Sequence, residues 1–235
     1  MFLLCPLAAI ALPERFSRGQ FCRVVHPDRS GRQEILTTTN SLTAEDLGSA
    51  AQRDRRRRIL DATIALASKG GFDAVQMRAV AEQADVALGT LYRYFPSKIH
   101  LLVSALGREF ERADASLGDK PIPGDTASDR VIFVLRKTTR GLQGDPHLTE
   151  ALTRAFMFAD ASVQAEIHTV GMLLTRMLTR AMHPGQTELT DDDVAIARVI
   201  GDVWLSALVG WVTGRTSAAD TAAQMEKAVH LLLRD

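Results

Sequence analysis

The sequence predicts an all-α protein of about nine helices, with an N-terminal helix-turn-helix domain of three helices and a larger C-terminal helical domain. Apolar residues recur at helical spacing in successive segments, and loops that contain Pro or Gly separate these segments. Residues 76–98 combine a helix, a tight corner and a short aromatic helix. The 235-residue chain is 46% apolar and 24% charged, with zero net charge, which is an ordinary globular composition.

The first 48 residues are predicted to form a disordered extension. Residues 1–12 are apolar enough to mimic a signal peptide, but they lack a basic start and are too short to span a membrane. Residues 13–48 show no sustained period. Cys5 and Cys22 both fall in this extension, so neither a disulfide framework nor a zinc knuckle is expected in the domains. A cytoplasmic protein without a membrane partner is expected.

The DNA-binding domain is predicted over residues 49–100, and it opens with a helix that carries a run of arginines. Apolar residues fall at helical spacing from Ile59, and Gly70 with Gly71 ends the helix. The arginines at its start are Arg55, Arg56, Arg57 and Arg58. Such a run is either a solvated basic face or a phosphate-binding surface. Its place just upstream of a helix-turn-helix favours phosphate contact.

The corner motif consists of two predicted helices whose apolar residues face a common core. These residues are Val80, Ala81, Ala84, Leu91 and Phe95, with the corner at residues 85–87. The residues left to face outward on the second helix are Thr90, Tyr92, Arg93 and Tyr94. Such a helix suits a major groove, where hydroxyl and guanidinium groups reach base edges and phosphates.

The C-terminal domain is predicted over residues 101–235, with a hinge in the Pro- and Gly-containing loop 117–125. Its helices are expected at residues 130–142, at 146–158 after Asp145, from about 163 to His183, and in two further segments after Thr190 and Ser217. The acidic triplet 191–193 suggests either a metal site or a charged first turn of a helix. Its place directly after Thr190 favours the first turn, so no metal is expected.

The last two predicted helices carry more apolar surface than a single core can hide. Their apolar residues are Ile196, Val199, Ile200, Val203, Trp204, Ala207, Leu208 and Trp211, then Ala222, Met225, Val229, Leu232 and Leu233. Part of this surface suits a symmetric four-helix interface between two copies. A homodimer would read double-stranded palindromic DNA, with recognition helices about 34 Å apart.

Residues 69–102 resemble the DNA-binding domain of the TetR family of repressors, whose signature ends in a run like Gly89 to Lys98. Within the family the chain resembles the KstR-type regulators of sterol catabolism in actinobacteria, since the likeness returns at residues 148–162 and 197–206 and covers roughly residues 50–234. Asp85 and Ala87 depart from the Gly and the Ser or Thr that are frequent in the wider family. Ala87 supplies no capping hydroxyl, at a cost of about 1 kcal/mol.

The resemblance implies a homodimeric repressor, not an enzyme, that leaves its operator when a CoA thioester of a cholesterol breakdown intermediate binds. No cofactor is implied. The residues expected to contact DNA are Arg55, Arg56, Arg57, Arg58, Gln76, Met77, Arg78, Leu88, Gly89, Thr90, Tyr92, Arg93, Tyr94 and Lys98. Those expected to line an effector cavity are Phe133, Leu135, Phe156, Met157, Phe158, Met172 and Trp204, with Arg140, Arg154, Arg176 and Arg180 as candidates for the phosphates. Without the resemblance, ordinary core packing and surface salt bridges would explain the same residues.

Other functions remain open on the residues alone. One is an acyl-CoA enzyme with an appended DNA-binding domain, and another is an architectural DNA binder without a ligand. The sequence has neither a Gly-rich phosphate loop nor a recognisable nucleophile motif, and its six histidines are scattered. Within the repressor hypothesis, a fatty acyl-CoA is an alternative to a steroid-CoA effector.

Overall fold

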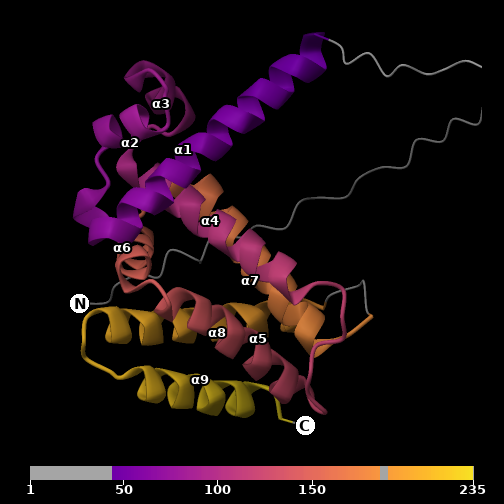
Figure 1. Ribbon diagram of the computed structural model, residues 1–235. Helices are drawn as coiled ribbons and strands as arrows, with labels where there is room; N and C mark the ends of the chain where they lie inside the picture. The colour runs from indigo at the N-terminus through magenta and orange to yellow at the C-terminus, as the bar shows by residue number, and fades with distance from the viewer. Residues whose placement is uncertain (1–43, 186–189, 235) are drawn as a thin grey trace, which may run out of the picture.

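The computed structural model describes residues 44–185 and 190–234, with side chains from residue 49 onward, and the regular elements in this part of the chain are all helices (Figure 1). The elements are α1 (Ala44–Ala74), α2 (Met77–Gln83), α3 (Leu88–Tyr94), α4 (Lys98–Leu117), α5 (Ala127–Gln143), α6 (Pro146–Met157), a 3₁₀ turn η2 (Ala161–Val163), α7 (Gln164–Met182), α8 (Asp191–Val212) and α9 (Ala218–Leu232). The all-α prediction is therefore confirmed for the described residues.

The helices are arranged in two tiers that α4 and α7 connect. In Figure 1, α1, α2 and α3 lie above, α4 and α7 run together through the middle, and α8 lies over α9 at the base. The most extensive helix–helix contact joins α1 to α6, and the next joins α4 to α7. The helix-turn-helix is thus attached to the C-terminal helices along two routes.

The first helix differs from its prediction at one end and agrees with it at the other. It begins at Ala44, inside the segment expected to be disordered, while residues 1–43 lie outside the described part. The predicted break at Gly70 and Gly71 is confirmed, because both have non-helical backbone angles. Gly71 has φ 67°, which strains any other residue, and a Cβ there would lie 2.6 Å from Glu150 Oε2 and displace that carboxylate.

Helix starts in the C-terminal domain follow the capping residues closely. Asp145 accepts a hydrogen bond from Leu148 N at 3.0 Å, as predicted. Capping boxes begin α8 and α9, at Thr190 with Asp193 and at Ser217 with Asp220, as their spacing indicated. A third box, at Thr126 with Asp129, starts α5 three residues earlier than predicted.

The cap of α8 makes its stability contribution dependent on pH. The hydrogen bond from the Thr190 hydroxyl is the main cause that holds the pKa of Asp193 below its usual 3.8. A depressed carboxyl pKa gives stabilisation that is fully present above the unfolded value and is lost as pH falls through the folded value. Thr190→Ala should therefore lower the free energy of unfolding by about 1 kcal/mol at pH 7. Urea unfolding should show this difference shrinking at pH 3, and a difference that persists in acid would contradict it.

Helix α8 is a core helix with one inner and one outer apolar face. By length and composition it could cross a membrane, the only such helix in the described part of the chain, but core helices pass the same test. Ile200 and Trp204 on its inner face are buried. On its outer face Val199 is 44% exposed, and on α9 Leu231 is 57% exposed. These exposed residues are apolar surface of the kind that a second copy would cover.

Candidate DNA interface and effector cavity

The helix-turn-helix is held together by a small apolar core and a tight corner. Val80 and Leu91 are fully buried and Phe95 is nearly so, as the periodicity predicted. Asp85 adopts φ 52° in the left-handed region, which aspartate tolerates better than most residues. At the start of α3, Ala87 makes no side-chain capping bond. The recognition helix is therefore positioned by packing rather than by its own cap.

Arg58, on α1, forms hydrogen bonds to the backbone of this corner. Its guanidinium donates to Ala84 O at 2.6 Å and to Asp85 O at 3.3 Å, and it lies 3.4 Å from a carboxylate oxygen of Asp54. The sequence predicted that Arg58 contacts phosphate. In the structure its guanidinium instead binds the two backbone carbonyls that follow α2. Its partner is 26 residues away in the sequence, so helical spacing could not reveal it.

The outer face of α3 carries the groups suited to a groove. Tyr92 is 47% exposed and Arg93 is exposed, while Thr90 and Tyr94 are half-buried. A Cβ added to Gly89 would meet no atom within 4 Å. Packing within the protein thus does not require glycine at this position, and the bare backbone leaves room for a close approach to DNA.

The remaining predicted DNA contacts fall into two groups. Gln76 and Arg78 are exposed at the start of α2, whereas Met77 and Leu88 are half-buried against the core. Lys98 is half-buried, with its Nζ 3.8 Å from the centre of the Phe72 ring, and burial lowers its pKa. It therefore sits at the junction of α1 and α4 rather than on the open face of α3.

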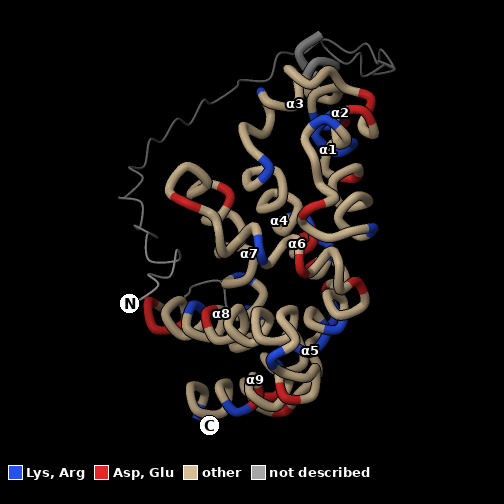
Figure 2. The backbone as a smooth tube through the Cα atoms, turned by 90° about the vertical axis from the view of Figure 1, so that its left-hand side faces the viewer, with Lys and Arg blue, Asp and Glu red and all other residues tan. Residues whose placement is uncertain are grey.

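The other three arginines of the predicted run belong to α1, which passes beside α2 (Figure 2). Arg57 pairs with Asp54 at 2.5 Å, and the Arg56 guanidinium lies 5.7 Å from the Phe95 ring centre. Arg55 is half-buried. Arg56 and Arg57 are exposed, so rearrangement of their side chains toward a phosphate costs little.

Because Arg58 binds backbone carbonyls and, within the described residues, the other three arginines do not, substitutions in the two groups should have different effects on DNA binding and on stability. Changing Arg55, Arg56 and Arg57 to Gln should weaken binding to operator and to unrelated DNA by similar factors, because phosphate contacts carry no sequence information. Arg58→Gln should instead lower the free energy of unfolding by about 1 kcal/mol, since it leaves two carbonyls without their partner. Fluorescence anisotropy and thermal unfolding distinguish the two. Selective loss of operator binding in the triple variant would contradict the first expectation.

A polar junction joins the end of α1 to α6. Glu150 accepts a hydrogen bond from Phe72 N at 2.8 Å, and Arg154 lies 4.5 Å from the Phe72 ring centre. Arg154 also approaches Asp73 at 3.4 Å. Arg154 was predicted to face effector phosphates, and the structure places it in this junction instead. One face of α6 therefore holds the DNA-binding domain.

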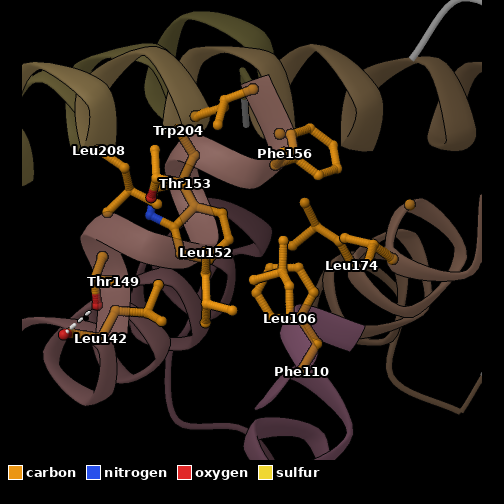
Figure 3. A pocket seen from close by; sticks show the side chains of 14 residues that line it. Leu106, Phe110, Leu142, Thr149, Leu152, Thr153, Phe156, Leu174, Trp204 and Leu208 are labelled. Atoms are coloured by element: carbon orange, nitrogen blue, oxygen red, sulfur yellow. Dashed lines mark hydrogen bonds between the residues drawn. The ribbon is translucent and has the colours of Figure 1, made fainter. Parts of the chain in front are cut away.

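The opposite face of α6 lines an apolar cavity of about 60 Å³ (Figure 3). The Trp204 ring stacks on Phe110 with centroids 5.7 Å apart, and its Nε1 donates to Thr139 Oγ1 at 2.9 Å. The side chains labelled in Figure 3 come from α4, α5, α6, α7 and α8 and surround the cavity. The lining residues are Leu106, Phe110, Leu142, Thr149, Leu152, Thr153, Phe156, Val170, Gly171, Leu174, Gly201, Trp204, Leu205 and Leu208.

Only part of the predicted cavity set lies here. Phe156 and Trp204 line the cavity, whereas the buried Leu135 lines a groove between α5 and α9. Four residues predicted to line it are exposed instead: Phe133 (36%), Met157 (49%), Phe158 (68%) and Met172 (49%). Arg176 and Arg180 pair with Asp114 across α7 and α4, and Arg140 faces the α5–α9 groove. Leu106, Phe110 and Leu174 were missed, although each lies on an apolar helical face.

Family models of known proteins match both the helix-turn-helix and the C-terminal helices. Residues 59–105 match the model described as bacterial regulatory proteins, tetR family, and residues 124–232 match the tetracyclin repressor-like C-terminal domain. The HTH-type transcriptional repressor KstR of Rhodococcus jostii is 62% identical, covering 88% of this chain and 95% of that protein. The chain belongs to the TetR family. The KstR repressor of Mycobacterium tuberculosis is 57% identical, covering 83% of this chain and 87% of that protein.

A solved structure of another TetR regulator has a similar fold. A TetR transcriptional regulator from Rhodococcus sp. RHA1 is 31% identical, covers 79% of this chain and 98% of that one, and superposes with a TM-score of 0.73. The relatives at high identity are transcriptional repressors. The chain is accordingly a DNA-binding transcriptional repressor of the KstR type, and the enzyme alternative is set aside.

Proposed function

We propose that this repressor acts in the cytoplasm as a homodimer on a palindromic operator that controls sterol catabolism genes, and that a steroid-CoA thioester releases it. Residues 49–100 form its DNA-binding domain and residues 101–235 its effector and dimerisation domain, with the outer faces of α8 and α9 joining the two copies. One observation carries the proposal. Helix α6 lines the apolar cavity through Phe156 and holds the end of α1 through Glu150.

The small size of the cavity explains how effector binding would release the repressor from DNA. About 60 Å³ is far below the roughly 300–1,000 Å³ of typical ligand pockets, so a steroid has to separate the surrounding helices. Displacement of α6 would pull on Phe72 through the Glu150 hydrogen bond, and displacement of α4 would move Lys98 at its start. In a dimer both shifts change the spacing of the two recognition helices from the roughly 34 Å that successive grooves require.

The test is an electrophoretic shift on the upstream region of the protein's own gene. We expect a single specific complex that a steroid-CoA thioester dissolves at concentrations where a fatty acyl-CoA has little effect. The reverse order would replace the effector class but leave the repressor intact. Equal affinity for operator and bulk DNA would instead support an architectural binder.

A further inference from the structure

We propose that the effector reaches the cavity through a cleft between α4, α5 and α6, and that Lys137, together with Arg112, binds the phosphates of its CoA group at the surface of this cleft. The inference rests on the proposed function, and it identifies the residues that recognise the part of the effector outside the cavity. Arg112 lies on α4 and Lys137 on α5.

The cleft adjoins the cavity. It encloses about 340 Å³ and shares Phe110, Leu142 and Thr149 with the cavity wall. In Figure 3, Leu142 and Thr149 close one side of the cavity, where Thr149 Oγ1 donates to Leu142 O at 2.6 Å. A single layer of side chains therefore separates the apolar interior from the surface at this place. Rotation of Leu142, which is only partly buried, would open a path through this layer.

One cation in the cleft, Lys137, has no carboxylate partner among the described residues. Four charged groups face it: Glu109, Arg112, Lys137 and Asp145. Arg112 pairs with Glu109 at 2.5 Å and also approaches Asp61 at 3.6 Å, and Asp145 caps α6. Lys137 Nζ donates to Ser116 O at 2.6 Å and, among the described residues, forms no ion pair. A phosphate at Lys137 would replace a neutral carbonyl by a charged acceptor, which forms the stronger hydrogen bond.

The cleft also has room for a ligand. A Cβ added to Gly141, which lines it, would meet no atom within 4 Å. By contrast, the other arginines of the C-terminal domain considered for phosphate binding lie away from both spaces. Arg154, Arg176 and Arg180 are paired with Asp73 and Glu150 or with Asp114, and Arg140 lines the α5–α9 groove. Lys137 and Arg140 are three positions apart on α5 and both border a second groove toward α9, but only Lys137 also lines the cleft beside the cavity.

Titration calorimetry on the full chain tests the assignment with two ligands, a steroid-CoA thioester and the methyl ester of the same steroid acid, which lacks phosphates. Lys137→Gln should weaken thioester binding about tenfold and leave methyl ester binding unchanged, the loss expected for one charge-assisted hydrogen bond. Lys137→Arg should restore binding. Arg140→Gln, on the same helix, is the matched control and should leave both ligands unaffected.

A second variant probes the route itself. Gly141→Leu places a side chain in the cleft and should weaken binding of both ligands without changing operator affinity. Equal effects of Lys137→Gln on both ligands, or no effect on either, would overturn the inference while leaving the proposed effector in place. A tenfold loss in Arg140→Gln would overturn it as well. Absence of thioester binding to the unmodified protein would overturn both the proposed effector and this site.

Discussion

Alanine at Tyr92 or Arg93 should each weaken operator binding by about tenfold to a hundredfold, the range expected when one good base or backbone contact is lost. Both side chains are exposed on α3, and within the described residues neither forms a side-chain hydrogen bond or an ion pair. Thermal unfolding should therefore stay nearly unchanged. The comparison is best made by anisotropy titration at several salt concentrations, because phosphate and base contacts differ in salt dependence.

The matched control for Arg93 is Arg215→Ala. Arg215 is also exposed, but it lies beyond the end of α8, in the lower tier of the molecule, so operator affinity should not change. If Tyr92→Ala and Arg93→Ala both bind operator as tightly as the unmodified protein, α3 does not read the groove. An unchanged affinity accompanied by a lowered melting temperature would assign these residues a structural role instead.

Local chemistry made most helix starts predictable. The hydroxyl–carboxylate pairs at Thr190 and Ser217 act within three residues, so their pattern is visible in the sequence, and the Gly70–Gly71 break follows from backbone freedom alone. The helix-turn-helix core was predictable for the same reason. Val80 and Leu91 belong to helices so short that each has only one apolar face.

The cavity was harder to predict because periodicity does not say which neighbour an apolar face meets. Helix α8 carries apolar residues on two faces, and only packing decides that Trp204 turns inward while Val199 turns outward. Met157 is the last residue of α6 and Phe158 follows it, and both are exposed although they continue the apolar run of the helix. Arg58 illustrates the same limit for charge, since the carbonyls that it binds belong to a distant helix.

Reciprocal coupling between effector and operator is the second large effect expected. If a steroid-CoA thioester weakens operator binding by a given factor, operator must weaken thioester binding by that same factor, within the roughly fivefold to 150-fold range of typical allosteric coupling. Calorimetry with and without operator measures one side, and anisotropy with and without thioester measures the other. Equal thioester binding in the presence and absence of operator would remove the allosteric mechanism.

Two glycine-to-alanine variants should separate the sites. Gly201 lies in the cavity wall, where an added Cβ would be 3.0 Å from Leu174 Cδ2, so Gly201→Ala should reduce thioester binding several-fold and leave operator affinity unchanged. Gly89→Ala adds its methyl to the open face of α3 and should do the opposite. Replacing glycine by alanine favours the helical conformation by about 1 kcal/mol at each position, so neither change is expected to unfold the protein.

Trp204→Ala should also reduce the release of operator by thioester, but it removes the Phe110 stacking and the Thr139 hydrogen bond together. The resulting loss of stability would obscure the interpretation of this variant. If Gly201→Ala weakened operator binding and Gly89→Ala weakened thioester binding, the two sites would not be separate, and α6 would not be the element that couples them.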